Sequence, residues 1–322
     1  MLRLGKIILN VPFFQSPLSG YSDYAMRTIS RRLGCPLTFA GVMLAKSAAN
    51  PKVLKKKLFL PGEDEHPVGA QILGSEPAEM VKAAVALEAI GYDIIDLNFA
   101  CPAPKVLRRG RGGALLAKPD TAIEMMKAVR GAVKCPVMVK LRIGRDESDE
   151  SKEDFWTILQ AADDEGIDAV TVHGRVVINS YRGKADWNIV SQVKQKFSSL
   201  TVIGSGDLLS AQSALDALRD SKIDGITIAR GAIGNPWIFS ELKAHFDGCG
   251  YEPPTIKEQK ELILHHFELV CRLYPDKKAV RYFRKFLPGY CKYHSKRKEA
   301  LLFLMEARTS EQFISKIEQL YN

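Results

Sequence analysis

One cysteine stands where its thiol could take part in chemistry. Cys101 follows the apolar run Ile94 to Asn98, precedes Pro102, and is followed by a basic, glycine-rich stretch from Lys105 to Gly113. A free cysteine has a pKa of about 8.5 and is mostly thiol near neutral pH, so Cys101 could donate a proton as a general acid. No histidine is adjacent in the sequence to favour a thiolate nucleophile, although a spatial neighbour stays open.

Four other polar residues lie at or near the ends of short apolar runs. They are Gln71, Asn98, Lys140 and His173. Each has an ordinary alternative as a backbone hydrogen-bonding group, a surface lysine or a buried histidine, because single polar residues near strand ends are common. Four such residues at one end of a set of strands would converge on one face, which favours a binding site there.

Two glycine-containing segments suggest an anion site. One is Gly204-Ser205-Gly206-Asp207 and the other is Ala229-Arg230-Gly231. Glycines let backbone N–H groups approach an anion, and Arg230 adds a fork of donors suited to phosphate. Two ordinary turns are the alternative. Because they follow the seventh and eighth predicted strands, where barrels commonly bind phosphate, we expect a phosphate group here.

The elements that position these residues follow a βα alternation, in which short β-branched or apolar runs are separated by amphipathic stretches of helical length. The eight runs are Phe13 to Leu18, Leu37 to Ala40, Val68 to Ile72, Ile94 to Asn98, Val137 to Leu141, Ala169 to His173, Thr201 to Gly204 and Gly225 to Ala229. Their spacing of about 30 residues predicts an α/β fold, a (β/α)8 barrel. An open doubly wound sheet is disfavoured because no G-x-G-x-x-G follows the first run.

A second, helical domain is predicted after the barrel. Pro119-Asp120 and Asn235-Pro236 open the barrel helices Thr121 to Val133 and Trp237 to Phe246. The Gly- and Pro-rich segment Asp247 to Pro254 indicates a linker. Beyond it, helical periodicity covers Lys257 to Leu273, Ala279 to Lys285 and Glu299 to Tyr321. We therefore predict a catalytic domain at residues 1–246 and an all-helical domain at residues 255–322.

The positive charge is concentrated near the end of the chain. The formal net charge is +9, and residues 255–322 hold 14 Lys/Arg against 8 Asp/Glu. Residues 277–298 contain nine Lys/Arg and no acid, and such patches attract polyanions. The six scattered cysteines have neither C-x-x-C nor zinc-like spacing, and no signal-peptide or membrane-length apolar run occurs. We expect a reduced cytoplasmic protein without a metal or a membrane contact.

Taken together, the motifs resemble the dihydrouridine synthases, over nearly the whole chain. The matching segments are Ser16-Pro17-Leu18-Ser19-Gly20 with Asp23, Gln71, Asn98 with Cys101-Pro102, Arg111 to Leu116, Lys140-Leu141-Arg142, His173-Gly174-Arg175, Tyr181 to Trp187 and Ala229-Arg230-Gly231. Their order and spacing make the resemblance specific. It implies an FMN-dependent oxidoreductase that reduces the C5=C6 bond of uridine in tRNA to dihydrouridine, with rRNA as an alternative and NADPH as the expected reductant.

The resemblance also implies roles for individual residues. The flavin ring would be contacted by Gln71, Lys140 and His173 and the flavin phosphate held near Gly206 and Arg230, within a cofactor set of Pro17, Leu18, Gln71, Lys140, His173, Ser205, Gly206, Asp207, Ala229 and Arg230. Flavin N5 would deliver hydride to uracil C6 while Cys101 protonates C5, with Asn98, Arg142 and Arg175 at the substrate. Ser205 stands where the family usually has Asn, which predicts one lost phosphate or backbone contact.

The predicted chemistry requires the target base to leave the RNA stack, so phosphate contacts elsewhere must hold the RNA. The candidates for these contacts in the helical domain are Lys278, Arg281, Arg284, Lys285, Lys296, Arg297 and Lys298. A solvated helix face is the alternative for these cations, but the absence of acids favours RNA contact.

Two other functions remain open from the sequence. An FMN barrel acting on a free pyrimidine, similar to the dihydroorotate dehydrogenases, would share the cofactor and the reduced bond. A non-catalytic RNA-binding protein, with a barrel that has lost its enzymatic activity, would be expected to lack Cys101 or the flavin contacts. The basic helical domain argues against the first function, and the presence of these residues argues against the second.

Overall fold

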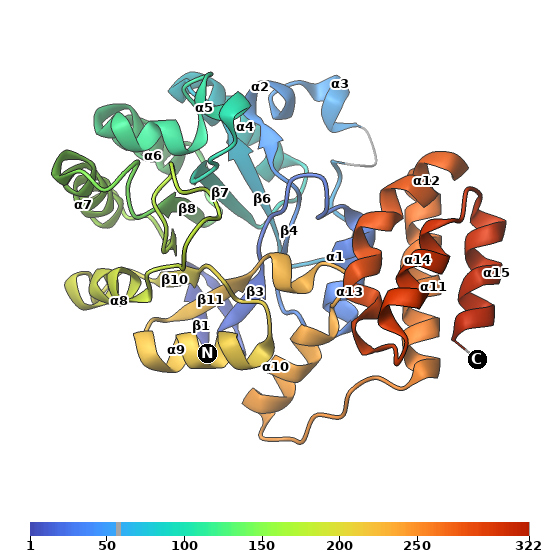
Figure 1. Cartoon of the computed structure of the whole chain (residues 1–322). Helices are drawn as coiled ribbons and strands as arrows, with labels where there is room; N and C mark the ends of the chain where they lie inside the picture. Colours follow the sequence, from blue (N-terminus) through green and yellow to red (C-terminus); the bar gives the residue numbers. More distant parts are fainter. Residues whose placement is uncertain (56–58, 322) are drawn as a thin grey trace.

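Eight parallel strands form a nearly closed barrel in the computed structural model (Figure 1). They are β3 (Phe13–Gln15), β4 (Thr38–Phe39), β6 (Val68–Leu73), β7 (Ile94–Phe99), β8 (Val137–Arg142), β9 (Ala169–His173), β10 (Val202–Ser205) and β11 (Gly225–Ile228). Pairing runs from β3 through β11, β10, β9, β8, β7 and β6 to β4. Where the ring would close, the Gln15 N–H donates to the Leu37 carbonyl at 3.1 Å. The predicted (β/α)8 barrel is confirmed.

The structure describes residues 1–55 and 59–321. Residues 56–58 of the expected catalytic domain and residue 322 of the expected helical domain lie outside the described residues. Within the described chain, no helix is both long enough and apolar enough to cross a membrane.

The barrel interior changes from apolar to polar along the strands, because alternate residues of a strand point to the same side. On β7, Ile94 packs in an apolar cluster, whereas Asp96 and Asn98, two and four residues later, are buried polar residues. At the apolar end, an unpredicted antiparallel hairpin of β1 (Leu2–Leu4) and β2 (Ile7–Leu9) packs Leu2 and Leu4 into this cluster. The polar end is therefore the end that can hold a ligand.

Helices surround the barrel, as the βα alternation predicts. They are α1 (Tyr24–Arg32), α2 (Ala45–Ala48), α3 (Pro51–Leu54), α4 (Pro77–Ala89), α5 (Pro104–Leu107), α6 (Pro119–Ala132), α7 (Asp149–Asp164), α8 (Trp187–Lys196), α9 (Ala211–Ser221) and α10 (Trp237–Asp247), with 3-10 turns η1 (Gly112–Ala117) and η2 (Arg230–Ala232). A short strand, β5 (Met43–Leu44), pairs with β6 before α2. The short helices α2, α3 and α5 therefore follow the carboxyl ends of strands.

The end of the chain forms a compact group of helices beside the barrel, at the right of Figure 1. They are α11 (Ile256–Leu273), α12 (Asp276–Phe283), α13 (Leu287–Tyr290), α14 (Arg297–Met305) and α15 (Ser310–Leu320), with turns η3 (Arg284–Phe286) and η4 (Cys291–Tyr293). The expectation of continuous helix from Glu299 to Tyr321 is wrong. The chain breaks after Met305, because Thr309 accepts a hydrogen bond from the Gln312 N–H and starts a new helix.

The helical region is held against the barrel by close backbone contacts. A Cβ on Gly234, after η2, would overlap the Phe286 carbonyl, and a Cβ on Gly289, in α13, would overlap the Ile233 carbonyl. Gly234 also has a φ of +63°, which favours glycine. The loop after β11, which carries Arg230, is thus packed directly onto the helical region.

Candidate active site

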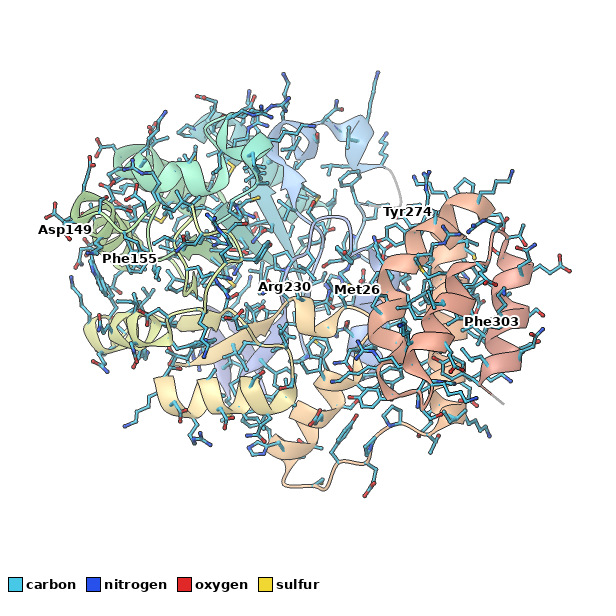
Figure 2. The ribbon with its side chains drawn as sticks, viewed as in Figure 1. Met26, Asp149, Phe155, Arg230, Tyr274 and Phe303 are labelled. Carbon is cyan, nitrogen blue, oxygen red and sulfur yellow. The ribbon has the colours of Figure 1, made fainter. Side chains whose placement is uncertain are left out.

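A cleft with a cavity volume of about 180 Å³ opens to solvent at the carboxyl ends of the strands. It is lined by all ten residues expected to bind the cofactor, namely Pro17, Leu18, Gln71, Lys140, His173, Ser205, Gly206, Asp207, Ala229 and Arg230. Cys101, Asn98 and Arg142 also line it. Arg230, labelled in Figure 2, lies near the middle of the view. The barrel therefore gathers these scattered residues around one space.

A chain of side-chain hydrogen bonds runs along the floor of this cleft. Gln71 Nε2 donates to Asp96 Oδ2 at 2.6 Å, and Asn98 Nδ2 donates to Gln71 Oε1 at 2.7 Å. Asn98 Oδ1 in turn accepts from the backbone N–H groups of Ala100 and Cys101, at 3.1 and 2.9 Å. Residues on two neighbouring strands are thereby linked to the backbone of the loop that carries Cys101.

Lys140 and Asp96 place opposite charges within the barrel. Lys140 Nζ donates to Ser205 Oγ at 3.2 Å, so the serine of the seventh loop has a partner within the protein. Burial lowers the pKa of Lys140, and the neighbouring Asp96 partly offsets this effect. Burial raises the pKa of Asp96, and the hydrogen bond from Gln71 and the charge of Lys140 oppose that rise. Each charge favours the ionised form of the other.

His173 is neutral at physiological pH in this setting. Burial lowers its pKa to about 2, and the positive charges of Lys140 and Arg142 act in the same direction. Within the described parts of the chain, its buried Nδ1 atom has no hydrogen-bond partner. A neutral imidazole has one donor and one acceptor nitrogen, and His173 lines the cleft, so its ring can meet a ligand there.

The loop after β7 holds Cys101 at the cleft wall. Cys101 is partly exposed, and its carbonyl accepts from the Gly113 N–H at 3.0 Å. A Cβ on Gly112 would lie 2.9 Å from the Cys101 Cβ, and the φ of Gly112 is +57°. Asn98 thus fixes the Cys101 N–H, and glycine backbone packs against its other side. Cys101 therefore lines the cleft from a loop that is anchored on both sides.

The loops after β10 and β11 meet at Asp207. Its carboxylate accepts two hydrogen bonds from Arg175 Nη2, at 2.7 and 2.6 Å, and Arg230 Nη2 lies 3.5 Å from Oδ1. Burial raises the pKa of Asp207, but the Arg175 hydrogen bond, the Ala185 N–H and the arginine charges hold it below the usual value. Gly206 has a φ of +131° and lies beside the His173 ring. A Cβ on Gly206 would lie 2.6 Å from the Ala185 Cβ, so both the φ and the packing at this position favour glycine.

Arg142 and Arg175 are held largely by the protein itself. Arg142 donates to the carbonyls of Ala100, Val176 and Ser180, at 3.0, 3.1 and 2.7 Å, and burial lowers its pKa to about 10. Arg175 is buried and does not line the cleft, although its Nη1 atom has no partner within the described residues. Both arginines therefore shape the loops around the cleft.

The basic residues of the helical region fall into two groups. Lys278, Arg281, Lys296, Arg297 and Lys298 are exposed, and Lys296 also lies 3.8 Å from Glu299. Arg284 and Lys285 are half-buried: Arg284 donates to the Ala307 carbonyl at 2.7 Å, and Lys285 contacts the Gly20 carbonyl and the Tyr282 ring. The first group can meet a polyanion in solvent, whereas the second joins parts of the protein together.

Sequence reasoning missed Asp96 and assigned no role to Tyr181. Asp96 looks like one polar residue in an apolar strand, but its position two residues before Asn98 places both side chains on the same side of β7. That period was the signal that could have identified it. Tyr181 lines the cleft with the Arg230 guanidinium 4.6 Å above its ring, and it lies in a loop, where no periodicity predicts such a contact.

Comparisons with known proteins agree with this geometry. Residues 14–320 match the family model described as dihydrouridine synthase. The tRNA-dihydrouridine synthase B of Pasteurella multocida is 34% identical over 295 residues, covering 90% of this chain and 86% of that protein. A probable tRNA-dihydrouridine synthase of Rickettsia conorii is 33% identical over 294 residues, covering 90% and 87%.

Solved structures share the fold at low sequence identity. Morphinone reductase in complex with tetrahydroNAD is 14% identical with a TM-score of 0.54, covering 78% of this chain and 90% of that one. Histamine dehydrogenase from Rhizobium sp. 4-9 is 15% identical with a TM-score of 0.57, covering 83% and 50%. These similarities concern the fold alone.

Proposed function

The chain belongs to the dihydrouridine synthase family of oxidoreductases, and from this premise we propose that it reduces the C5=C6 bond of a uridine in tRNA, with FMN as cofactor and NADPH as reductant. The observation that carries the proposal is the convergence of Cys101, Lys140 and His173 on one cleft that is also lined by the glycine-containing loops at Gly206 and Arg230.

The cleft fits a flavin mononucleotide. Lys140 Nζ and the neutral imidazole of His173 are polar groups suited to the carbonyl-rich ring of the cofactor, and both residues line the cleft. The Gly206 loop and Arg230 supply backbone and guanidinium donors suited to its phosphate. When bound and reduced, FMN supplies the hydride for the reaction. We assign no separate site to NADPH.

The protein's part in the reaction is to hold a proton and to orient the base. Cys101 Sγ holds the proton that uracil C5 receives, and its loop keeps the thiol at the cleft wall. Lys140 brings positive charge where reduction makes the bound ring electron-rich. Asn98, Arg142 and Arg175 are the candidates that orient the uracil, Arg142 and Arg175 by shaping the loops around it.

An RNA substrate is supported by the distribution of unpaired cations. Several cations on the barrel flank pair with acids, including Lys152 with Asp149 at 2.8 Å and Arg219 with Asp216 at 3.0 Å. Asp149 is labelled at the outer edge of the barrel in Figure 2. These flank charges are locally neutralised.

The cations after β5 and β7 differ. We call Lys46, Lys52, Lys105, Arg108 and Arg109 the rim cluster; all five are exposed, and none forms an ion pair within residues 1–55 and 59–321. No acid occurs between Asp23 and Glu63 or between Asp96 and Asp120. Their helices, α2, α3 and α5, lie along the upper edge of Figure 1. Because barrel loops after strands share the face of the active site, these cations favour a polyanion at the cleft mouth.

The deciding experiment has two parts. The purified protein should be yellow, with the absorption bands of a flavin, and tRNA from cells that lack the gene should lose dihydrouridine by mass spectrometry. Expressing the intact gene should restore the modification, while a Cys101→Ala copy should not. A colourless protein, or unaltered dihydrouridine in tRNA, would contradict the proposal.

Two alternatives have distinct signatures in the same experiment. Loss of dihydrouridine from rRNA with intact tRNA would identify rRNA as the substrate. A yellow protein that leaves both RNAs unchanged and oxidises reduced flavin with a free pyrimidine would identify a small-molecule reductase. The rim cluster argues against the second alternative, because a small acid requires no extended cationic surface.

A further inference from the structure

A buried carboxylate lies beneath the cleft, and no role has been assigned to it so far. Asp96 is 2% exposed and accepts a hydrogen bond from Gln71. Its other oxygen, Oδ1, is buried and has no hydrogen-bond partner within the described residues. An unsatisfied buried oxygen is unfavourable for stability, so a role other than stability is the more reasonable account of this residue.

The amide chain above Asp96 can run in only one direction. The backbone N–H groups of Ala100 and Cys101 can only donate, so Asn98 must turn its oxygen towards them. Asn98 must then donate from Nδ2 to Gln71 Oε1, and Gln71 must donate from Nε2. The chain is complete only if the group beneath Gln71 accepts a hydrogen bond, and Asp96 Oδ2 does so at 2.6 Å.

We propose that Asp96 is a positioning residue that, through the Gln71 and Asn98 amides, fixes the backbone of Cys101 and hence the place of its thiol. The inference rests on the proposed function only in treating Cys101 as the proton donor. Asp96 acts by accepting a hydrogen bond and is distinct from the groups that touch the substrate. Each amide also keeps a second N–H, and both Gln71 and Asn98 line the cleft.

Two substitutions separate hydrogen-bond acceptance from charge. Asp96→Leu removes the acceptor and fills the site with an apolar side chain, whereas Asp96→Asn removes the charge but retains an acceptor oxygen that the amide chain can orient towards Gln71. A positioning role predicts a large effect for Asp96→Leu and a small one for Asp96→Asn. A role that depends on the charge beside Lys140 predicts equally large effects for the two, and that result would overturn the proposal.

The first readout needs no cofactor. Alkylation by iodoacetamide is followed by peptide-resolved mass spectrometry, with the exposed Cys249 as an internal reference. We expect the ratio of the Cys101 rate to the Cys249 rate to change at least threefold in Asp96→Leu and less than twofold in Asp96→Asn. An unchanged ratio in Asp96→Leu would overturn the proposal. If Asp96→Leu does not fold, Gln71→Met interrupts the same chain one link higher and carries the same prediction.

The second readout uses the flavin-loaded enzyme. Reduction of the flavin by NADPH does not use Cys101, whereas its reoxidation by tRNA does. Asp96→Leu should slow reoxidation at least tenfold and change the reduction rate less than twofold, while equal slowing of both steps would indicate a general structural role and contradict the proposal. If the wild-type protein does not modify RNA, the proposed function fails, and the alkylation ratio still decides the role of Asp96.

Discussion

The cleft floor and the cleft mouth treat charge in opposite ways. On the floor, Asp96, Gln71 and Asn98 form a directed chain of hydrogen bonds, and the half-buried Lys140 lies near the carboxylate. At the mouth, the rim cluster is exposed and unpaired with any acid of the described chain. Buried groups are costly unless their partners are fixed, whereas exposed charges keep their water until a ligand replaces it. The floor therefore holds its side chains in a fixed geometry, whereas the mouth can attract a negatively charged ligand.

We expect the largest effect on the reaction rate from Cys101, whose loop lies between the floor and the mouth. Cys101→Ala should retain flavin and RNA binding but slow reoxidation of the reduced flavin by tRNA about 10²- to 10⁴-fold, because a positioned proton donor is lost. Stopped-flow absorbance with RNA present measures this rate. Reoxidation at the wild-type rate would show that Cys101 is not the proton donor.

The contrast between buried and exposed charge also predicts stability. Arg27 and Glu65 form a bidentate pair, at 2.6 and 2.8 Å, with both side chains 1% exposed. Arg27→Met should reduce the free energy of unfolding by about 3–5 kcal/mol, because it leaves Glu65 buried and uncompensated. Arg219→Met removes an exposed pair and should change the free energy of unfolding by about 0–1 kcal/mol. Chemical denaturation compares the two, and equal losses would contradict the distinction.

The mouth is tested by removing its charge. Replacing the rim cluster by alanine should weaken tRNA binding about tenfold or more and reduce the magnitude of the slope of log K against log salt by about 4, since each phosphate contact contributes about 0.7–0.9. Fluorescence anisotropy over a salt series measures both quantities.

A control for overall charge comes from the barrel flank. Lys82, Lys127, Lys134, Lys152 and Lys222 are exposed on or beside outer helices, and replacing these five by alanine should leave the salt slope nearly unchanged. If the rim variant and this control behave alike, the rim cluster does not meet the phosphate backbone.

The smallest expected effect is the contribution of His173 to the pH dependence of stability. Because the pKa of His173 is lowered to about 2, the unfolded chain binds the extra proton below about pH 6.5 and stability is lost as the pH falls. This one group accounts for about 1.4 kcal/mol between about pH 7.5 and pH 5.5. His173→Asn should flatten the acid side of the stability curve by that amount.

A second buried histidine contributes to the remaining slope, and the raised pKa of Asp96 opposes it. His266, in the helical region, has a pKa lowered to about 3, mainly by burial, and so acts in the same direction. Denaturant unfolding at several pH values therefore should show a reduced, not abolished, acid sensitivity in His173→Asn. An unchanged curve would mean that His173 titrates alike in the folded and unfolded chains.

The sequence was most informative where one physical cause dominates. Period and β-branching predict all eight barrel strands, and glycines together with polar strand ends predict the residues that line the cleft. The hairpin of β1 and β2 escaped because no helical stretch separates these strands from each other or from β3, so they do not follow the βα alternation that identified the barrel strands. The break before Thr309 was detectable from its capping side chain, but the apolar periodicity on either side concealed it.

The sequence could not show which polar side chains already have hydrogen-bond partners within the protein. Arg281 and Arg284 cannot be told apart by residue type, yet Arg284 donates to the Ala307 carbonyl while Arg281 is exposed. The period of β7 marks Asp96 as an interior residue, but its partner Gln71, which lies 25 residues earlier, is revealed only by the fold. Residue type indicates what a side chain can do, and only the fold determines whether another group has already engaged it.

The close contacts at Gly234 and Gly289 fix the distance between the cleft and the helical region. They join the loop that carries Arg230 to η3 and α13, which lie in the chain between α12 and α14, the helices with the exposed cations; the contact is backbone against backbone. Under the proposed function, an RNA held on those helices would present to the cleft only the nucleotide at one set distance from its anchored phosphates. The protein would then select its uridine by the distance between that nucleotide and the anchored phosphates, and it would not need to recognise the neighbouring bases.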